Sequence, residues 1–250
     1  QARGTTPVLL SLTVRNIWND DRLERGSGRF GAWTYALATE LDVPFLDVTN
    51  TVADRLEPRG PGAVAALYPQ DHTHFGAEAA DLHASLIVAG LKGLRPNPVA
   101  EFLSEKGEVV PADGLAWLKL PFPANPELPT IFLIGDSTVR NGRGGGSNGE
   151  WGWGDFIDAH FDRTRINVVN RAVGGLSSRT YWSQGHWTRV LGMMKRGDFV
   201  VMQFGHNDGG PINDTSRARG SIKGIGEETE SIDNLLTGEP EVVHTYGWYL

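Results

Sequence analysis

Ser137 is the residue of this sequence best placed to act as a nucleophile. It follows an apolar run, Ile131–Ile134, within the tripeptide Gly135-Asp136-Ser137. Active sites of open parallel sheets form at the carboxyl ends of the strands, so this position favours catalysis. A serine nucleophile also needs a base that accepts its proton. By itself, the tripeptide is about equally consistent with a serine that caps a helix.

Asp71 and His74 can supply that base. In a tight turn, an Asp three residues before a His can accept a hydrogen bond from Nδ1, which leaves Nε2 facing the serine. Taken alone, the pair is more typical of the N-cap of a helix, and a helical pattern starts near Gly76. His72 and His74 could instead bind a metal, but no further clustered carboxylate or cysteine supports this, so we predict no metal site.

Two further segments can stabilise developing negative charge. Residues 170–175, Asn-Arg-Ala-Val-Gly-Gly, follow an apolar run, and Gly175 would let a backbone N–H approach a substrate oxygen. Residues 205–208, Gly-His-Asn-Asp, follow another, where the Asn207 side chain can donate to an oxyanion. Each segment alone is more typical of a turn. All four segments together indicate an active site much more strongly.

The elements that must position these residues follow an α/β pattern. Helical spacing predicts helices over Phe30–Leu41 and Phe75–Leu86, and weaker patterns add Asp155–Phe161 and Gly185–Lys195. The alternation of strands and helices predicts a three-layer α/β/α fold with a central five-stranded parallel sheet. Five apolar runs predict its buried strands: Val8–Leu12, Phe45–Val48, Ile131–Ile134, Asn167–Val169 and Phe199–Phe204.

We predict a single domain, formed by residues 1–94 and 129–250. Between them, residues 95–128 are rich in proline and predict a linker that lies over the surface. Residues Gly209–Pro240 predict a second long irregular segment. His244–Leu250 is typical of a helix start and Gln1–Thr6 of a helix end, which suggests that the two termini meet in space.

Composition argues against several classes of protein. Hydrophobic residues make up 40% of the chain, which favours an ordered core. The net charge of −7, without a stripe of Lys or Arg, argues against a nucleic-acid partner. The absence of cysteine excludes disulfides and thiolate sites. No apolar stretch reaches the roughly 18 residues of a membrane helix. The first four residues are not a signal peptide.

The four segments together resemble the SGNH hydrolases, also called the GDSL esterase superfamily. The resemblance implies an SGNH (flavodoxin-like) fold and a serine esterase that needs no metal or cofactor. It also implies that Ser137 is the nucleophile, His74 the base and Asp71 the residue that orients His74. The oxyanion hole would be formed by the N–H groups of Ser137 and Gly175 and the side chain of Asn207.

A narrower resemblance is to the bacterial rhamnogalacturonan acetylesterases. It covers Gln1–Leu94 and Pro129–Leu250, and it implies removal of acetyl groups from the rhamnogalacturonan backbone of pectin by a secreted or periplasmic enzyme. The motifs that carry it are Thr13–Asn16, Gly135–Thr138, Trp151–Gly154, Asn170–Thr180, Gln203–Asp208 and His244–Trp248.

The order of the motifs departs from the family, in which the Asp and His come last. Here Asp71 and His74 precede Ser137. Three interpretations remain: a circular permutant joined through residues 95–128, a chain cut from a tandem protein, or a dimer in which two chains exchange halves. We favour the single-chain permutant.

An acetylated polysaccharide or oligosaccharide is the expected partner. We expect sugar contacts from Trp151, Trp153, Trp182, His206 and, for acidic sugars, Arg179. Tyr246 is a further stacking candidate, and Arg140, Arg143 and Arg171 are further candidates for carboxylates. Two alternatives are an esterase of the same fold that acts on acetylated xylan or small esters, and an inactive carbohydrate-binding protein. Polar loops argue against a lipid substrate.

Overall fold

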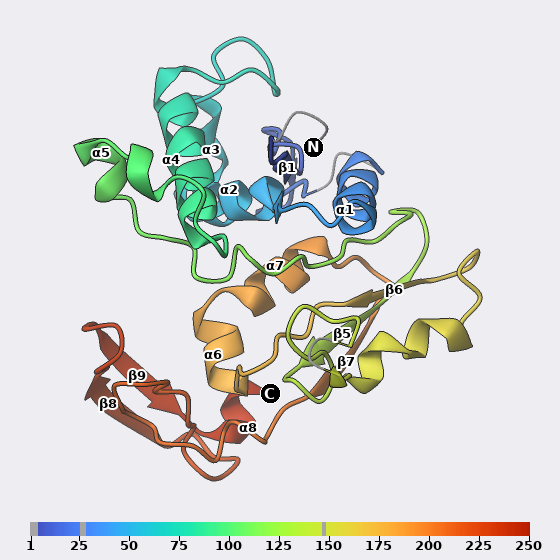
Figure 1. The fold of residues 1–250 in the computed structure, drawn as a ribbon, viewed down its shortest axis with the longest axis vertical. Helices are drawn as coiled ribbons and strands as arrows, with labels where there is room; N and C mark the ends of the chain where they lie inside the picture. Colours follow the sequence, from blue (N-terminus) through green and yellow to red (C-terminus); the bar gives the residue numbers. More distant parts are fainter. Residues whose placement is uncertain (1–4, 26–28, 147–148) are drawn as a thin grey trace. The chain divides into compact units, whose positions relative to one another are not determined.

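The structure is a computed structural model that describes residues 5–25, 29–146 and 149–250. It contains two compact units, Gln1–Glu127 and Leu128–Leu250, whose elements are labelled in Figure 1. Among the described residues, no helix combines the length and apolar character needed to span a membrane.

The first unit is mainly helical around two short parallel strands. β1 (Leu9–Leu10) pairs with β4 (Phe45–Leu46), and β2 (Trp18–Asn19) pairs with β3 (Arg22–Leu23) in an antiparallel ribbon. The α-helices are α1 (Phe30–Glu40), α2 (Val48–Leu56), α3 (Gly60–Ala65) and α4 (Ala77–Gly93), and a 3₁₀ turn, η1 (Glu57–Arg59), joins α2 to α3. Buried Leu and Val side chains of α2 and β4 pack against α4 and form the main core.

Residues 95–127 are more than the surface linker that their prolines predict. They contain η2 (Ala100–Phe102) and α5 (Glu105–Glu108), and they belong to the first unit. Leu118 and Leu120 are buried, and the Phe122 ring packs edge-on against Phe45 at 5.9 Å between centroids. The segment follows the unit closely because its apolar side chains fill positions beside α1 and β4.

The second unit contains a three-stranded parallel sheet in the order β6-β5-β7. β5 (Thr130–Gly135) lies between β6 (Asn167–Asn170) and β7 (Phe199–Gln203), and every residue of β5 is buried. Trp153 and Ile157 pack against Ile131 and Leu133 on one face. In Figure 1 these turns (yellow) lie on the opposite side of the sheet from α6 (Ser178–Ser183) and α7 (His186–Met193). Because the three strands are parallel, their carboxyl ends lie at the same edge of the sheet.

Some predicted elements differ from those observed. The predicted strands form, but in two sheets, β1-β4 and β6-β5-β7, so a single five-stranded sheet and the circular permutation remain predictions. The prediction that Phe199–Phe204 is a buried strand is wrong, because β7 is mostly exposed. The helix predicted over Asp155–Phe161 is wrong: η4 (Trp153–Asp155) and η5 (Ile157–His160) are 3₁₀ turns. Their hydrogen bonds join residues three apart, as is usual in short segments between fixed ends. The helix predicted over Gly185–Lys195 is confirmed by α7.

The end of the chain is also more regular than predicted. β8 (Thr229–Asp233) pairs with β9 (Pro240–His244), and a short helix, α8 (Tyr246–Tyr249), follows. The sequence did not reveal this hairpin because Ile232 is the one apolar residue in β8, so no apolar run marks the strand.

Candidate active site

A tight turn places Ser137 directly beyond the end of β5. Oδ1 of Asp136 accepts hydrogen bonds from the Thr138 backbone N–H (2.9 Å) and hydroxyl (2.8 Å). The Asp136 carbonyl accepts from the N–H groups of Val139 and Arg140, both at 3.1 Å. An Asp that bonds to the backbone two residues on stabilises such a turn. Ser137 is therefore half-buried at the carboxyl end of the central strand.

The Gly174–Gly175 turn lies beside Ser137. The Val173 N–H donates to Gly135 O at 3.0 Å, which ties the turn to the end of β5. A Cβ added to Gly174 would lie 3.5 Å from the Cβ of Ser137. Gly175 has a φ of +87°, a conformation that glycine adopts at little cost. No hydrogen bond within the described part of the chain uses the N–H of Ser137 or Gly175, so both can face a ligand.

Asn207 joins this group from the loop after β7. Its Nδ2 donates to Leu176 O at 2.7 Å, directly after the glycine turn. A side-chain amide carries two N–H donors, so one remains for a ligand. The next residue, Asp208, accepts from the Ser178 N–H at 3.1 Å and from the Ser178 and Ser221 hydroxyls. These bonds fasten the loop to the start of α6. The second unit thus holds Ser137, Gly175 and Asn207 through a short chain of contacts.

Asp71 and His74 form a hydrogen-bonded pair within the first unit. Oδ2 of Asp71 lies 2.7 Å from Nδ1 of His74, and Oδ1 accepts from the N–H groups of Thr73 and His74, both at 2.7 Å. The side-chain hydrogen bond with His74, followed by the two backbone bonds, lowers the pKa of Asp71 well below its ordinary value. Asp71 is therefore a carboxylate at neutral pH, and it fixes the ring of His74.

The loop that carries this pair is anchored at both ends. The Asn16 N–H donates to His72 O, and the Gly76 N–H donates to Leu67 O, both at 2.8 Å. The alternative that Asp71 or His74 caps a helix is wrong, because the N-cap of α4 is Gly76 and no side chain bonds to that cap. The pair belongs to the first unit and Ser137 to the second, and their joint action remains a prediction.

The aromatic candidates for sugar binding have different environments. Trp151 is exposed and packs on Phe156, whereas Trp153 is half-buried and donates from Nε1 to Gln203 Oε1 at 2.8 Å. His206 is exposed beside Asn207. Contact of these side chains with a sugar remains a prediction.

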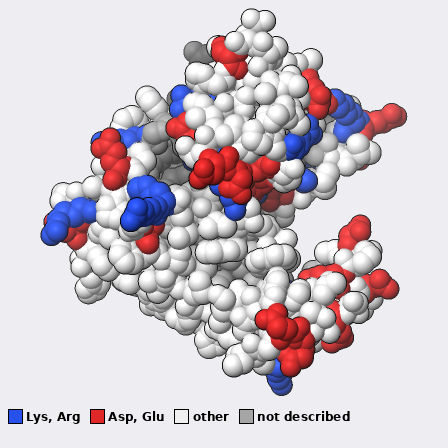
Figure 2. Space-filling view, turned by 180° about the vertical axis from the view of Figure 1, so that it is seen from behind, with Lys and Arg blue, Asp and Glu red and all other residues white. Residues whose placement is uncertain are grey.

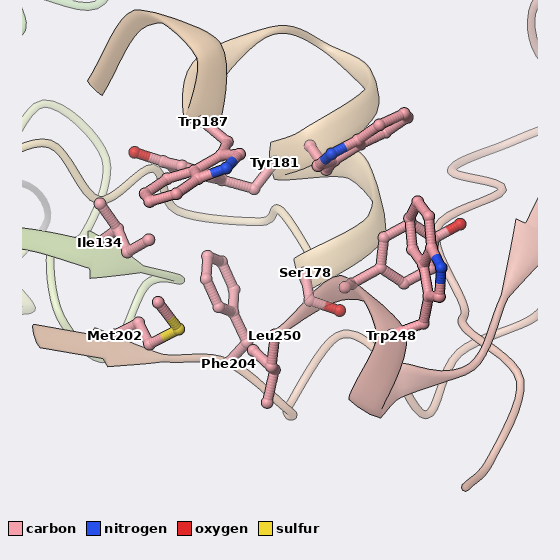
Figure 3. A pocket seen from close by; sticks show the side chains of 10 residues that line it. Ile134, Ser178, Tyr181, Trp187, Met202, Phe204, Trp248 and Leu250 are labelled. Carbon is pink, nitrogen blue, oxygen red and sulfur yellow. The ribbon is translucent and has the colours of Figure 1, made fainter. Parts of the chain in front are cut away.

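Trp182 lines an aromatic pocket of about 280 Å³ in the second unit. Figure 3 shows Trp187 of α7 across this pocket from Phe204 and Met202. Trp182 itself packs edge-on against Trp248 of α8, with 5.5 Å between ring centroids. Sequence reasoning missed the pocket because its aromatic residues come from α6, α7, the end of β7 and α8, and no local pattern links them.

The prediction that Arg179 contacts the substrate is wrong. Its side chain is fully buried, and its guanidinium donates to both carboxylate oxygens of Glu241 (2.8 and 2.6 Å) and to the carbonyls of Ile212 and Gly220 (both 2.7 Å). It therefore ties α6 to β9 and to the loop before β8. Arg140 and Arg171 are also buried, so they do not offer their charge on the surface.

Replacing Arg179 by methionine is expected to reduce the free energy of unfolding by about 3–5 kcal/mol, because Glu241 would lose its buried partner. Urea denaturation of the full chain measures this change in the free energy of unfolding. The control, Arg163→Met, removes an exposed pair with Asp158 and should cost at most about 1 kcal/mol. A raised KM with unchanged stability would instead restore Arg179 as a substrate contact.

Sequence reasoning also missed Arg219. Its Nη1 donates to Gly175 O at 2.5 Å, so the guanidinium lies against the glycine turn. Arg219 is 44 positions from Gly175 in a segment without a clear pattern, and no spacing signal could have paired them.

The sequence of the second unit is similar to a known family of hydrolases. Residues 131–236 match the family described as GDSL-like lipase/acylhydrolase. This segment contains Ser137, Gly175 and Asn207, whereas Asp71 and His74 lie outside it. The predicted resemblance to the GDSL superfamily is therefore confirmed.

Similar proteins carry more specific names. A rhamnogalacturonan acetylesterase of Emericella nidulans is 36% identical over 122 residues, which are 48% of this chain and 44% of that protein. The probable rhamnogalacturonan acetylesterase YesY of Bacillus subtilis is 41% identical over 78 residues, 31% of this chain and 35% of that protein. The crystal structure of YxiM from Bacillus subtilis matches at 32% identity and a TM-score of 0.30, over 34% of this chain and 24% of that one. This chain spans less than half the length of each.

Proposed function

We propose that this protein is a serine carboxylic ester hydrolase that removes acetyl groups from a carbohydrate. One observation carries the proposal: Ser137 lies beside the Gly174–Gly175 turn, and the N–H groups of Ser137 and Gly175 are both unused, in a segment that matches the GDSL-like family. A nucleophile beside such donors is suited to acyl transfer, because the donors stabilise a tetrahedral oxyanion.

In the proposed mechanism, Ser137 Oγ attacks the acetyl carbonyl while its proton passes to Nε2 of His74. The oxyanion accepts hydrogen bonds from the N–H groups of Ser137 and Gly175 and from Nδ2 of Asn207. The bond to the sugar oxygen then breaks, His74 returns the proton to that oxygen, and an acetyl-serine remains. Water attacks this ester through the same base, which releases acetate and restores Ser137. Asp71 holds His74 in the required tautomer.

The proposed substrate is the rhamnogalacturonan backbone of pectin. Two relatives similar to this chain are named for it, and the exposed Trp151 and Trp182 can stack on sugar rings. A polymeric substrate also favours secretion. The proposal further includes assembly of the complete site by one permuted chain, with a half-exchanged dimer as the alternative.

The test is acetate release from acetylated rhamnogalacturonan, acetylated xylan and a small acetyl ester by the purified chain. The proposal expects release from the pectic polymer at the highest kcat/KM. Faster release from xylan or the small ester would indicate an esterase of other specificity. Binding of the polymer without release from any ester would indicate an inactive carbohydrate-binding protein.

Replacing Asn207 by alanine is expected to lower kcat for the small ester by about 10²–10³-fold, because one oxyanion donor is lost. KM should change little, since this bond forms mainly in the transition state. Asn213→Ala is the control, because Asn213 donates to Asp233 O on the exposed surface. An unchanged kcat for Asn207→Ala would exclude the donor role.

A further inference from the structure

Arg219 is a cation held against the proposed oxyanion turn, and the mechanism above does not use it. Its Nη1 donates to Gly175 O at 2.5 Å, and a Cβ added to Gly175 would lie 3.8 Å from the same nitrogen. Gly174 in turn lies beside Ser137. Arg219 and Ser137 therefore both lie against the glycine turn that is proposed to bind the acetyl oxygen.

Hydrogen bonds to Asp214 stabilise the loop that presents Arg219. Oδ1 of Asp214 accepts hydrogen bonds from the N–H groups of Ser216 (2.8 Å), Arg217 (2.6 Å) and Ala218 (3.0 Å). Ala218 is buried and has a φ of +40°, which is uncommon for a residue other than glycine. Backbone conformations of this kind persist where the surroundings enforce them, often at functional sites.

No ion pair among the described residues involves Arg219. Partial burial, together with the nearby charge of Arg217, lowers the pKa of Arg219, whereas Asp214, Asp136 and Asp208 oppose this shift. Arginine nevertheless stays protonated in proteins, and its guanidinium has five N–H donors. The donors not used by Gly175 O can bind a carboxylate, a planar group that fits the guanidinium fork.

The surrounding surface is unfavourable for anions, which makes a local cation important. Figure 2 shows Asp and Glu gathered on the β8–β9 hairpin. The exposed acidic side chains of this region are Glu227, Glu228, Glu230, Asp233 and Glu239. An acidic polymer therefore gains no long-range attraction here, and it needs a direct contact with a fixed cation.

We propose that Arg219 binds the carboxylate of an acidic sugar next to the acetylated hydroxyl and so selects esters of uronic acids. This inference rests on the proposed function and assigns its specificity to one side chain. Arg219 takes no part in proton transfer: it binds substrate while it supports the glycine turn through Gly175 O.

The test compares two substrates that differ only in the carboxylate: an acetylated galacturonate oligomer and its methyl-esterified counterpart. Wild type should prefer the free acid. Arg219→Gln should lower the ratio of kcat/KM for the acid to kcat/KM for the methyl ester by about 10- to 100-fold, mainly through KM for the acid. Loss of the bond to Gly175 O lowers activity on both substrates alike, so it cancels in this ratio. Arg219→Lys should keep part of the preference, since a lysine retains the charge but not the fork. Arg217→Gln is the matched control on the exposed side of the same loop.

An equal loss on both substrates would overturn the proposal, because it would show that Arg219 only supports the turn. Failure of the esterase function is distinguishable, since wild type would then release acetate from neither substrate. In that case, calorimetric titration of the galacturonate oligomer and its methyl ester decides the question. Stronger binding of the acid that Arg219→Gln removes would support the carboxylate site, and equal binding of both would overturn it. Circular dichroism confirms that the variants are folded.

Discussion

Replacing Ser137 by alanine is expected to abolish acetate release, with kcat reduced by about 10⁶-fold if the three residues act as a unit. In the proposed mechanism this hydroxyl forms the acetyl intermediate, and no second nucleophile is proposed. Release from acetylated rhamnogalacturonan and from the small ester measures the effect. Substrate binding should persist, because the removed hydroxyl is not one of the proposed sugar contacts. Release unaffected by the change would exclude the proposed mechanism.

The same variant tests how the complete site is assembled. Mixed with His74→Ala, it should stay inactive if each chain completes its own site. Recovery of up to about one quarter of the activity after unfolding and refolding together would indicate that two chains exchange halves, because one of the two sites in a mixed dimer would be intact. Each variant refolded alone is the control.

Replacing Asp71 by asparagine is expected to lower kcat by about 10⁴-fold with little change in KM. Oδ1 of Asp71 accepts two backbone N–H bonds, and an asparagine oxygen can keep them. Its amide nitrogen would then replace Oδ2 and donate to Nδ1 of His74. The proton of the ring would move to Nε2, which could no longer accept the proton of the serine.

The tautomer explanation for Asp71 has its own controls. Asp81→Asn, which alters an exposed carboxylate on α4, should leave kcat unchanged. Because the pKa of Asp71 is lowered by its bond to His74, wild-type activity should not fall with Asp71 protonation anywhere near neutral pH. A kcat within about threefold of wild type for Asp71→Asn would show that His74 does not need this partner.

The residues of the proposed site could be predicted from the sequence because each belongs to a strong local pattern. Ser137 follows the buried strand β5, Gly175 follows the partly buried β6, and Asn207 follows β7. Apolar runs mark such strands, and parallel strands bring their carboxyl ends to one edge. The hydrogen bond of Asp71 to His74 spans three residues, so local spacing was enough to predict it. Short-range features of this kind depend little on the rest of the fold.

The sequence by itself therefore located the proposed nucleophile, the proposed donors beside it, the Asp–His pair and the parallel α/β character of the second unit. Only the tertiary structure decided what the arginines do. The partners of the buried Arg179, namely Ile212, Gly220 and Glu241, lie 33 to 62 positions away, and Gly175 lies 44 positions from Arg219, so no local pattern predicts these contacts. Residue type predicts a charge, but burial and long-range partners decide whether that charge holds the fold together or faces a substrate.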